Sequence, residues 1–170
     1  MLPRPPEGLR HWQPADAPAL EAAWRDPEIT RWNPAPGDLD AAAWIAGAEE
    51  RWTRRLALDL VIEPPPARDV GTVPFEQVAG EVGFSSFTAG PARAELGVWI
   101  APPHRRAGVA TAAVATAAAW ALDELDLDQV WARTDLANAA ALALFAGLGW
   151  QRLGESGGKA IWSVARPLLR

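Results

Sequence analysis

The chain has 170 residues, a net charge of −5, two histidines and no cysteine. This length predicts one domain, spanning residues 1–170, with its own hydrophobic core. The absence of cysteine excludes disulfides, thiolate metal ligands and a cysteine nucleophile, and the acidic balance argues against nucleic-acid binding. Because His11 and His104 lie far apart in the sequence, we expect no metal site.

The N-terminal residues 1–7 have no apolar core of the kind that signal peptides carry, and no run of 18 apolar residues could span a membrane. We therefore expect a cytoplasmic protein without a membrane partner. The charge is uneven, because residues 1–95 hold 15 acidic and 9 basic side chains, whereas residues 96–170 hold 6 and 7. The acidic part would suit a cationic substrate.

In the first half of the chain, aspartates mark the expected helix starts. Asp16, Asp26 and Asp38 are typical N-cap residues, and Pro27 suits the first position of a helix. The loop after these elements contains four prolines between residues 63 and 76. The expected elements are a short strand at 9–12, helices at 16–24, 26–32 and 38–54, and a strand at 56–62.

The second half is expected to alternate strands with two helices. A turn at 89–92 joins two strands into a hairpin, and a strand that follows a helix should lie parallel through a right-handed crossover. The expected elements are strands at 78–88 and 93–100, a helix at 108–122, a strand at 129–134, a helix from 138 to 147 or 149, and a hairpin of 150–153 with 159–165. The predicted fold is α/β, a mixed sheet of about seven strands with one parallel pair, flanked by helices.

One segment between a strand and a helix predicts an anion site. Pro102 and Pro103 end the strand, and the alanine-rich helix begins near Gly108. The first amides of a helix lack internal partners and lie at the positive end of its dipole. Arg105 and Arg106 add full positive charges there, so the segment favours phosphate. The glycine patterns of P-loops and dinucleotide-binding folds are absent.

Three motifs in order resemble the GNAT superfamily of acyl-CoA-dependent N-acetyltransferases. Residues 105–110, Arg-Arg-Ala-Gly-Val-Ala, are similar to its pyrophosphate-loop pattern Gln/Arg-x-x-Gly-x-Gly/Ala, and Asn138 stands eleven residues before Gly149-Trp150. The N-terminal motifs are similar to the Rim-type branch, which acetylates N-terminal amines of ribosomal proteins. Those motifs are Leu9-Arg10, Asp16, Asp26-Pro27-Glu28 and Trp32.

The resemblance implies acetyl-CoA as co-substrate and no metal. It assigns the coenzyme pyrophosphate to the amides that precede and open the helix, and the pantetheine arm to the backbone of the preceding strand. Asn138 could hold the pantetheine end, cap its helix, or do both, and the Trp99 side chain could simply pack in the core. The positions assigned to the coenzyme are Val98, Trp99, Ile100, Arg105, Arg106, Ala107, Gly108, Val109, Ala110, Thr111, Asn138 and Phe145.

For the chemistry, the resemblance favours a glutamate base. Glu95 is the first candidate and Glu81, on the neighbouring strand, is the second; either could instead be a solvent-facing strand residue. Many relatives have a tyrosine seven residues after the asparagine, which acts as the general acid and protonates the sulfur. This chain has no tyrosine, and Phe145 and Ala141 occupy the usual positions of the general acid. Trp32 and Trp44, in the N-terminal helices, could line an acceptor pocket or serve the core.

The expected function is acetyl transfer to a primary amine. An α-amine with a pKa of about 7.8 loses its proton far more readily than a lysine near 10.4, so a site without a clear acid favours a peptide or protein N-terminus. The alternatives are a small-molecule amine acetyltransferase, an acyl-CoA-binding sensor or interaction module of the same fold, and a purely structural protein. The resemblance also allows a homodimer.

Overall fold

The computed structural model describes residues 1–37, 40–65 and 73–166. Its strands form one seven-stranded sheet in the order β1-β2-β3-β4-β5-β7-β6. Among the strands of the described residues, β4 and β5 alone run parallel, so the predicted mixed sheet with one parallel pair is confirmed. The strands are β1 (Leu9–His11), β2 (Ala57–Ile62), β3 (Gly80–Ala89), β4 (Ala92–Ile100), β5 (Gln129–Asp135), β6 (Gln151–Ser156) and β7 (Lys159–Ala165).

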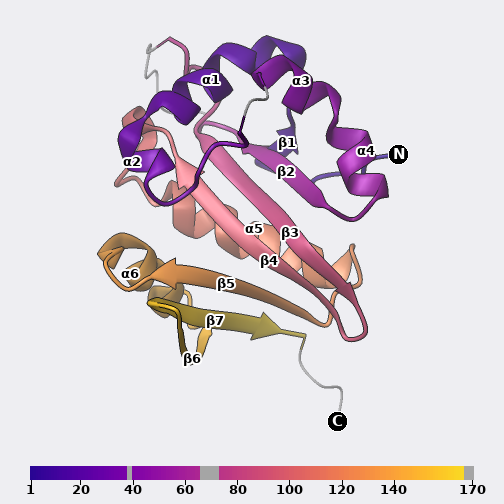
Figure 1. Ribbon diagram of the computed structural model, residues 1–170, viewed down its shortest axis with the longest axis vertical. Helices are drawn as coiled ribbons and strands as arrows, with labels where there is room; N and C mark the ends of the chain where they lie inside the picture. The colour runs from indigo at the N-terminus through magenta and orange to yellow at the C-terminus, as the bar shows by residue number, and fades with distance from the viewer. Residues whose placement is uncertain (38–39, 66–72, 167–170) are drawn as a thin grey trace.

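Helices cover both faces of the sheet. The N-terminal helices lie across one face of β2 to β4, and α5 runs behind the same strands (Figure 1). One apolar core packs the sheet against α5, and a second packs it against the N-terminal helices. The helices are α1 (Ala17–Arg25), α2 (Pro27–Thr30), α3 (Ala41–Ala46), α4 (Ala48–Thr53), α5 (Val109–Asp123) and α6 (Ala139–Gly147).

The region predicted as one helix over 38–54 is two short helices that meet at Gly47. Glycine is unfavourable in the interior of a helix, and this favours a break at Gly47. The Asp40 carboxylate caps α3 by accepting the Ala43 amide at 2.6 Å, whereas the cap predicted at Asp38 lies outside the described residues. Asp26 caps α2 as predicted, accepting the amides of Glu28 and Ile29.

Asp16 does not cap α1 with its side chain, so that prediction is wrong. A short 3-10 turn, Pro14–Asp16, comes before the helix. The Asp16 carboxylate accepts two hydrogen bonds from Arg10, at 2.6 and 2.9 Å, and one from the Gln13 amide. A charged partner on β1 outcompetes the helix amides for this carboxylate.

The parallel pairing of β4 with β5 is short. It covers Arg93, Ala94 and Glu95, opposite residues 129–131, and there it ends. Beyond this point β5 stays paired with β7 up to Asp135, and β4 stays paired with β3 up to Ile100. The two strands diverge (Figure 1), so the last residues of β4 have a strand neighbour on one edge only.

No helix among residues 1–37, 40–65 and 73–166 has the length and apolar character needed to cross a membrane.

Gly80 should be irreplaceable because of its contact with β4. A Cβ at this position would lie 2.2 Å from the Trp99 carbonyl oxygen and 3.1 Å from the Ile100 Cα, both backbone atoms. We expect Gly80→Ala to cost about 2–4 kcal/mol and to lower the melting temperature by roughly 5–15 °C. Gly147→Ala is the control, because its Cβ would enter open space at the end of α6. Equal melting temperatures for both variants would contradict this packing.

Candidate active site

Three carboxylates share the sheet face that the N-terminal helices cover. Strand register sets Glu81 opposite Trp99, and Glu95 opposite Ser85. Asp59, on β2, is opposite Gly83. Because side chains alternate along a strand, residues two apart on β2, β3 or β4 lie on one face of the sheet. Trp99 packs in the core with the N-terminal helices, so the face that carries Trp99 is the one that these helices cover.

Two glycines leave this face bare between the carboxylates. Gly83 and Gly97 are directly opposite each other on β3 and β4. A Cβ on Gly83 would lie 2.9 Å from Asp59 Oδ1, so the Asp59 carboxylate sits over that glycine. A Cβ on Gly97 would lie 3.9 Å from Asn33 Oδ1. The glycine pair therefore forms a floor with oxygen atoms on two sides.

Glu81 is held by two tryptophans. Its carboxylate accepts the indole N–H of Trp12 at 2.8 Å and of Trp99 at 3.1 Å. Burial, together with the nearby Asp59 carboxylate, raises the pKa of Glu81 to about 8, although the two indole N–H groups and Arg51 act in the opposite direction. A carboxylate of this pKa is well suited to accept a proton near neutral pH.

Asp59 is neutralised by an arginine from α4. Arg51 Nη2 lies 3.3 Å from Asp59 Oδ2. Burial raises the pKa of Asp59, and Arg51 opposes that shift. Arg51 is itself held in place, because its guanidinium stacks 3.8 Å from the centre of the Trp44 ring and donates to the Trp44 carbonyl at 2.6 Å.

Glu95 is engaged in a two-point ion pair. Arg133, on β5, donates to its two carboxylate oxygens at 2.8 and 2.9 Å. Ser86 Oγ donates at 3.3 Å. Glu95 therefore lies on the same face as Glu81 but already has a cationic partner, whereas no ion pair of Glu81 with arginine or lysine is found among the described residues.

The edge of β4 that β5 leaves offers backbone groups. The Ala101 amide bonds to the Ala79 carbonyl on the β3 side. Since backbone groups alternate between the two edges of a strand, those of Val98 and Ile100 face the diverging side. Side chains reach both carbonyls there, Asn33 Nδ2 to Val98 at 3.4 Å and Arg105 Nε to Ile100 at 3.0 Å.

The loop before α5 has two residues with positive φ and leads into helix amides without partners. Gly108 caps α5 with a φ of 76°, and a Cβ there would enter open space. Arg106 is exposed and also has a positive φ of 58°. The first amides of α5, from Val109 to Thr111, have no partners within the helix. Ala107, between these residues, packs its methyl group against the core.

The Arg105 side chain makes several contacts within the protein. Besides its bond to the Ile100 carbonyl, its guanidinium pairs with Glu28 at 2.5 Å and lies 3.7 Å from Asp26. It thereby ties the first turn of α2 to the end of β4. The phosphate contact predicted for its side chain stays a prediction.

The two residues assigned to the coenzyme at α6, its N-cap Asn138 and Phe145, have different surroundings. The Asn138 side chain caps α6 by accepting the Ala141 amide at 3.1 Å, which confirms the capping alternative and leaves its coenzyme role a prediction. Phe145 is 3 % exposed, and its ring centre lies 4.8 Å from that of Trp150 and 6.2 Å from that of Trp162. In this structure Phe145 serves the core, and its coenzyme contact also stays a prediction.

The two tryptophans predicted for the acceptor pocket have different surroundings. Trp44 packs edge-on against Trp24 and carries the Arg51 guanidinium on its ring, next to Asp59. Trp32 is half-buried beneath the Arg31 guanidinium, directly before Asn33 in the chain. Of these two tryptophans, Trp44 is the one that contacts among the described residues connect to a carboxylate, through Arg51.

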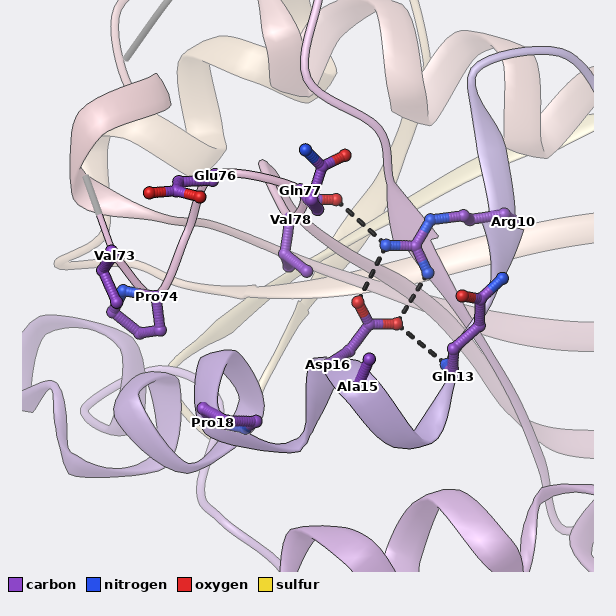
Figure 2. A pocket seen from close by; sticks show the side chains of 10 residues that line it. All are labelled: Arg10, Gln13, Ala15, Asp16, Pro18, Val73, Pro74, Glu76, Gln77 and Val78. Atoms are coloured by element: carbon purple, nitrogen blue, oxygen red, sulfur yellow. Dashed lines mark hydrogen bonds and ion pairs between the residues drawn. The ribbon is translucent and has the colours of Figure 1, made fainter. Parts of the chain in front are cut away.

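A separate cavity of about 360 Å³ opens beside β1 and the turn before α1. The Arg10–Asp16 pair lies in its wall, and Arg10 also donates to the Gln77 carbonyl (Figure 2). It contains none of the predicted site residues. Within the described parts of the chain, no group of three or more histidine, aspartate or glutamate side chains could hold a metal ion.

The sequence pattern of the Acetyltransferase (GNAT) domain family matches residues 8–151, which is most of the chain. The chain belongs to this family of acetyltransferases. The suspected GNAT resemblance is therefore confirmed, and so is the expectation of an enzyme. No curated protein sequence gives a significant match.

Solved structures of acetyltransferases share the fold at low sequence identity. Mycobacterium smegmatis RimJ, in complex with CoA-disulfide, has a TM-score of 0.73 at 21% identity, over 92% of this chain and 80% of its own. The Vibrio fischeri ribosomal-protein-S5-alanine acetyltransferase has 0.75 at 17%, over 95% and 94%. The Vibrio cholerae spermidine N-acetyltransferase, with CoA and spermine, has 0.71 at 15%, over 92% and 94%. These neighbours include enzymes for different acceptors.

The pKa of Glu81 predicts how stability depends on pH. Its folded-state pKa of about 8 is above the ordinary value of 4.5, so the folded chain binds the extra proton and loses stability as the pH rises through this interval. Glu81→Gln removes this loss. The difference in melting temperature, Glu81→Gln minus the native chain, should therefore be larger at pH 8.5 than at pH 5, by at least about 3 °C. Glu95→Gln is the control, and a constant difference for Glu81→Gln across the range would contradict the assignment.

Proposed function

We propose that the chain transfers the acetyl group of acetyl-CoA to a primary amine, favouring the α-amine of a peptide or protein N-terminus. The observation that carries this proposal is the Glu81 carboxyl group. It has a raised pKa and two neutral indole donors, and it lies one strand away from the free edge of β4. Glu81 replaces Glu95 as the first candidate base, because Arg133 already pairs with Glu95.

The coenzyme would lie along the free edge of β4 and across the start of α5. The amides of Val98 and Ile100 face that edge and suit a strand-like pairing with the amide groups of pantetheine. The pyrophosphate would approach the loop at Gly108, where no Cβ intervenes, and meet the first amides of α5 and the exposed Arg106. Asn138 supplies a further amide at the start of α6.

The transfer itself balances without a cofactor. Glu81 takes a proton from the ammonium group of the acceptor, and the neutral amine then attacks the thioester carbonyl carbon. The second proton passes from the amine nitrogen to solvent after the attack. The carbon–sulfur bond then breaks, and the electron pair leaves on the coenzyme A sulfur. Since thiol pKa values are about 8.5, the thiolate is a fair leaving group even though the sequence has no tyrosine to protonate it.

The pKa of Glu81 favours an α-amine over a lysine. Proton transfer from an α-ammonium group with a pKa of about 7.8 to a carboxylate with a pKa of about 8 is nearly balanced. From a lysine near 10.4 the same transfer is uphill by roughly 3 kcal/mol. Trp44, which flanks the carboxylates through Arg51, and Trp32, next to Asn33, would border the acceptor.

Two other functions fit parts of the structure. A small-molecule amine would meet the same carboxylates, and the structural neighbours include spermidine acetyltransferases as well as ribosomal-protein acetyltransferases. An acyl-CoA sensor would explain the missing acid, since Phe145 is a core residue. Release of free thiol with a peptide, a polyamine or no acceptor at all separates these three functions.

The role of Glu81 predicts a large loss of activity on substitution. A general base contributes about 100-fold or more to the rate, so Glu81→Gln should lower kcat/KM for a peptide acceptor by at least that factor and leave the dissociation constant for coenzyme A unchanged. For the native chain, kcat/KM should rise with pH and level off above about pH 8. The matched variant Glu95→Gln should retain activity within about tenfold. A larger loss in Glu95→Gln than in Glu81→Gln would reverse the assignment.

The coenzyme loop can be tested with two glycines of similar conformation. Gly108 and Gly149 have φ values of 76° and 73°, and a Cβ at either would enter open space. Alanine at both positions therefore carries the same backbone strain, but only Gly108 lies in the proposed pyrophosphate site. We expect Gly108→Ala to weaken coenzyme A binding by about tenfold, measured by calorimetry, through obstruction of the loop amides. Equal affinities for the two variants would argue against this site.

A further inference from the structure

The sheet face that carries Glu81, Asp59 and Glu95 is called the acceptor face below. The three carboxylates differ in whether an arginine pairs with them. Asp59 has Arg51, and Glu95 has Arg133. The hydrogen bonds of Glu81 come from two neutral indole groups. Among the described residues, this face therefore has one carboxylate that an incoming cation can neutralise, and two that already have an arginine.

We propose that this face accepts a single positive charge, and that Arg51 and Arg133 are specificity-determining residues that exclude polyamines in favour of acceptors with one ammonium group. The inference rests on the proposed function, since it assumes that the amine reacts beside Glu81. A peptide N-terminus meets the condition, because the groups that follow its ammonium are neutral amides.

Arg133 lies just beyond the point where β4 and β5 separate. It follows Trp131, the last residue of β5 that pairs with β4, by two positions. Its guanidinium grips both oxygens of Glu95 and lies 5.4 Å from the centre of the Trp131 ring. On β4, the next residue on this face after Glu95 is Gly97, which is exposed. The guanidinium thus stands beside the glycine floor.

Arg51 closes the opposite side of the floor. Its guanidinium is held by the Trp44 ring and carbonyl, and its partner Asp59 lies over Gly83. An ammonium group could not displace it without breaking these contacts, because the Arg51 side chain is only 16% exposed. A second positive charge on an acceptor that reaches Glu81 therefore meets a fixed guanidinium on either side.

The energetic consequence is repulsion that depends on charge number. The first ammonium is attracted to Glu81 once this carboxyl group has lost its proton, but each further ammonium loses hydration and is repelled by Arg51 or Arg133. Because Arg133 is about half exposed, salt should screen its part of the effect. Removing Arg133 would convert Glu95 from a neutralised carboxylate into a second anionic subsite.

The test compares Arg133→Gln with Arg152→Gln. Arg152 also pairs with a single carboxylate, Glu155, but on the β6–β7 hairpin away from this face. Acceptors are a lysine-free peptide with a free N-terminus and spermidine. The readouts are kcat/KM from thiol release, and calorimetric binding of each acceptor to the protein saturated with coenzyme A.

The native chain should prefer the peptide. Arg133→Gln should raise the ratio of spermidine to peptide kcat/KM by about fivefold at low salt, strengthen spermidine binding by a similar factor, and lose much of the gain at high salt. Arg152→Gln should leave the ratio unchanged.

Two results would overturn the inference. One is a ratio and an affinity for spermidine that do not change in Arg133→Gln, with the variant folded as judged by its melting temperature. The other is a native chain that prefers spermidine. Absence of turnover with either acceptor would instead count against the proposed function, and the calorimetric comparison of spermidine binding would still decide the inference.

Discussion

The end of the β4–β5 pairing at Glu95 is the constraint on which the rest of the site depends. Backbone groups of a buried strand must find partners, and β4 continues to Ile100 after its parallel neighbour has turned away. Asn33 and Arg105 reach the two carbonyls on that edge. Since Asn33 follows α2, and Arg105 pairs with Glu28 on α2, the chain around α2 is anchored to the same strand edge that would guide the coenzyme.

The sheet face that the N-terminal helices cover carries three carboxylates. Gly83 and Gly97 remove the side chains that would separate Glu81, Asp59 and Glu95, so the three carboxylates share one face of the sheet without side chains between them. Arginines from α4 and β5 neutralise two of them, and the third is left with indole donors. Burial of Glu81 costs stability above pH 5, and the same burial gives the carboxyl group the raised pKa that the proposed proton transfer would use.

The sequence predicted the order of helices and strands along the chain, the β3–β4 hairpin, the parallel pair and the loop before α5, because strands, breakers and glycines act through local chemistry. It ranked Glu95 above Glu81, since it could not show that Arg133, 38 residues later, would pair with Glu95. It missed Asp59, although a lone charged residue in the apolar run of residues 58–62 is a recognisable signal. Trp12, Asn33 and Arg51 carry no such signal, because their roles arise only where distant segments pack together.

The proposed chemistry depends on the raised pKa of Glu81, about 8. The most direct measurement is a carbon-13 NMR titration of the glutamate side-chain carboxyl groups, with Glu81 assigned by its loss in Glu81→Gln. We expect one carboxyl resonance that titrates near pH 8 and disappears in that variant. A Glu81 resonance that titrates close to the ordinary value of 4.5 would contradict it.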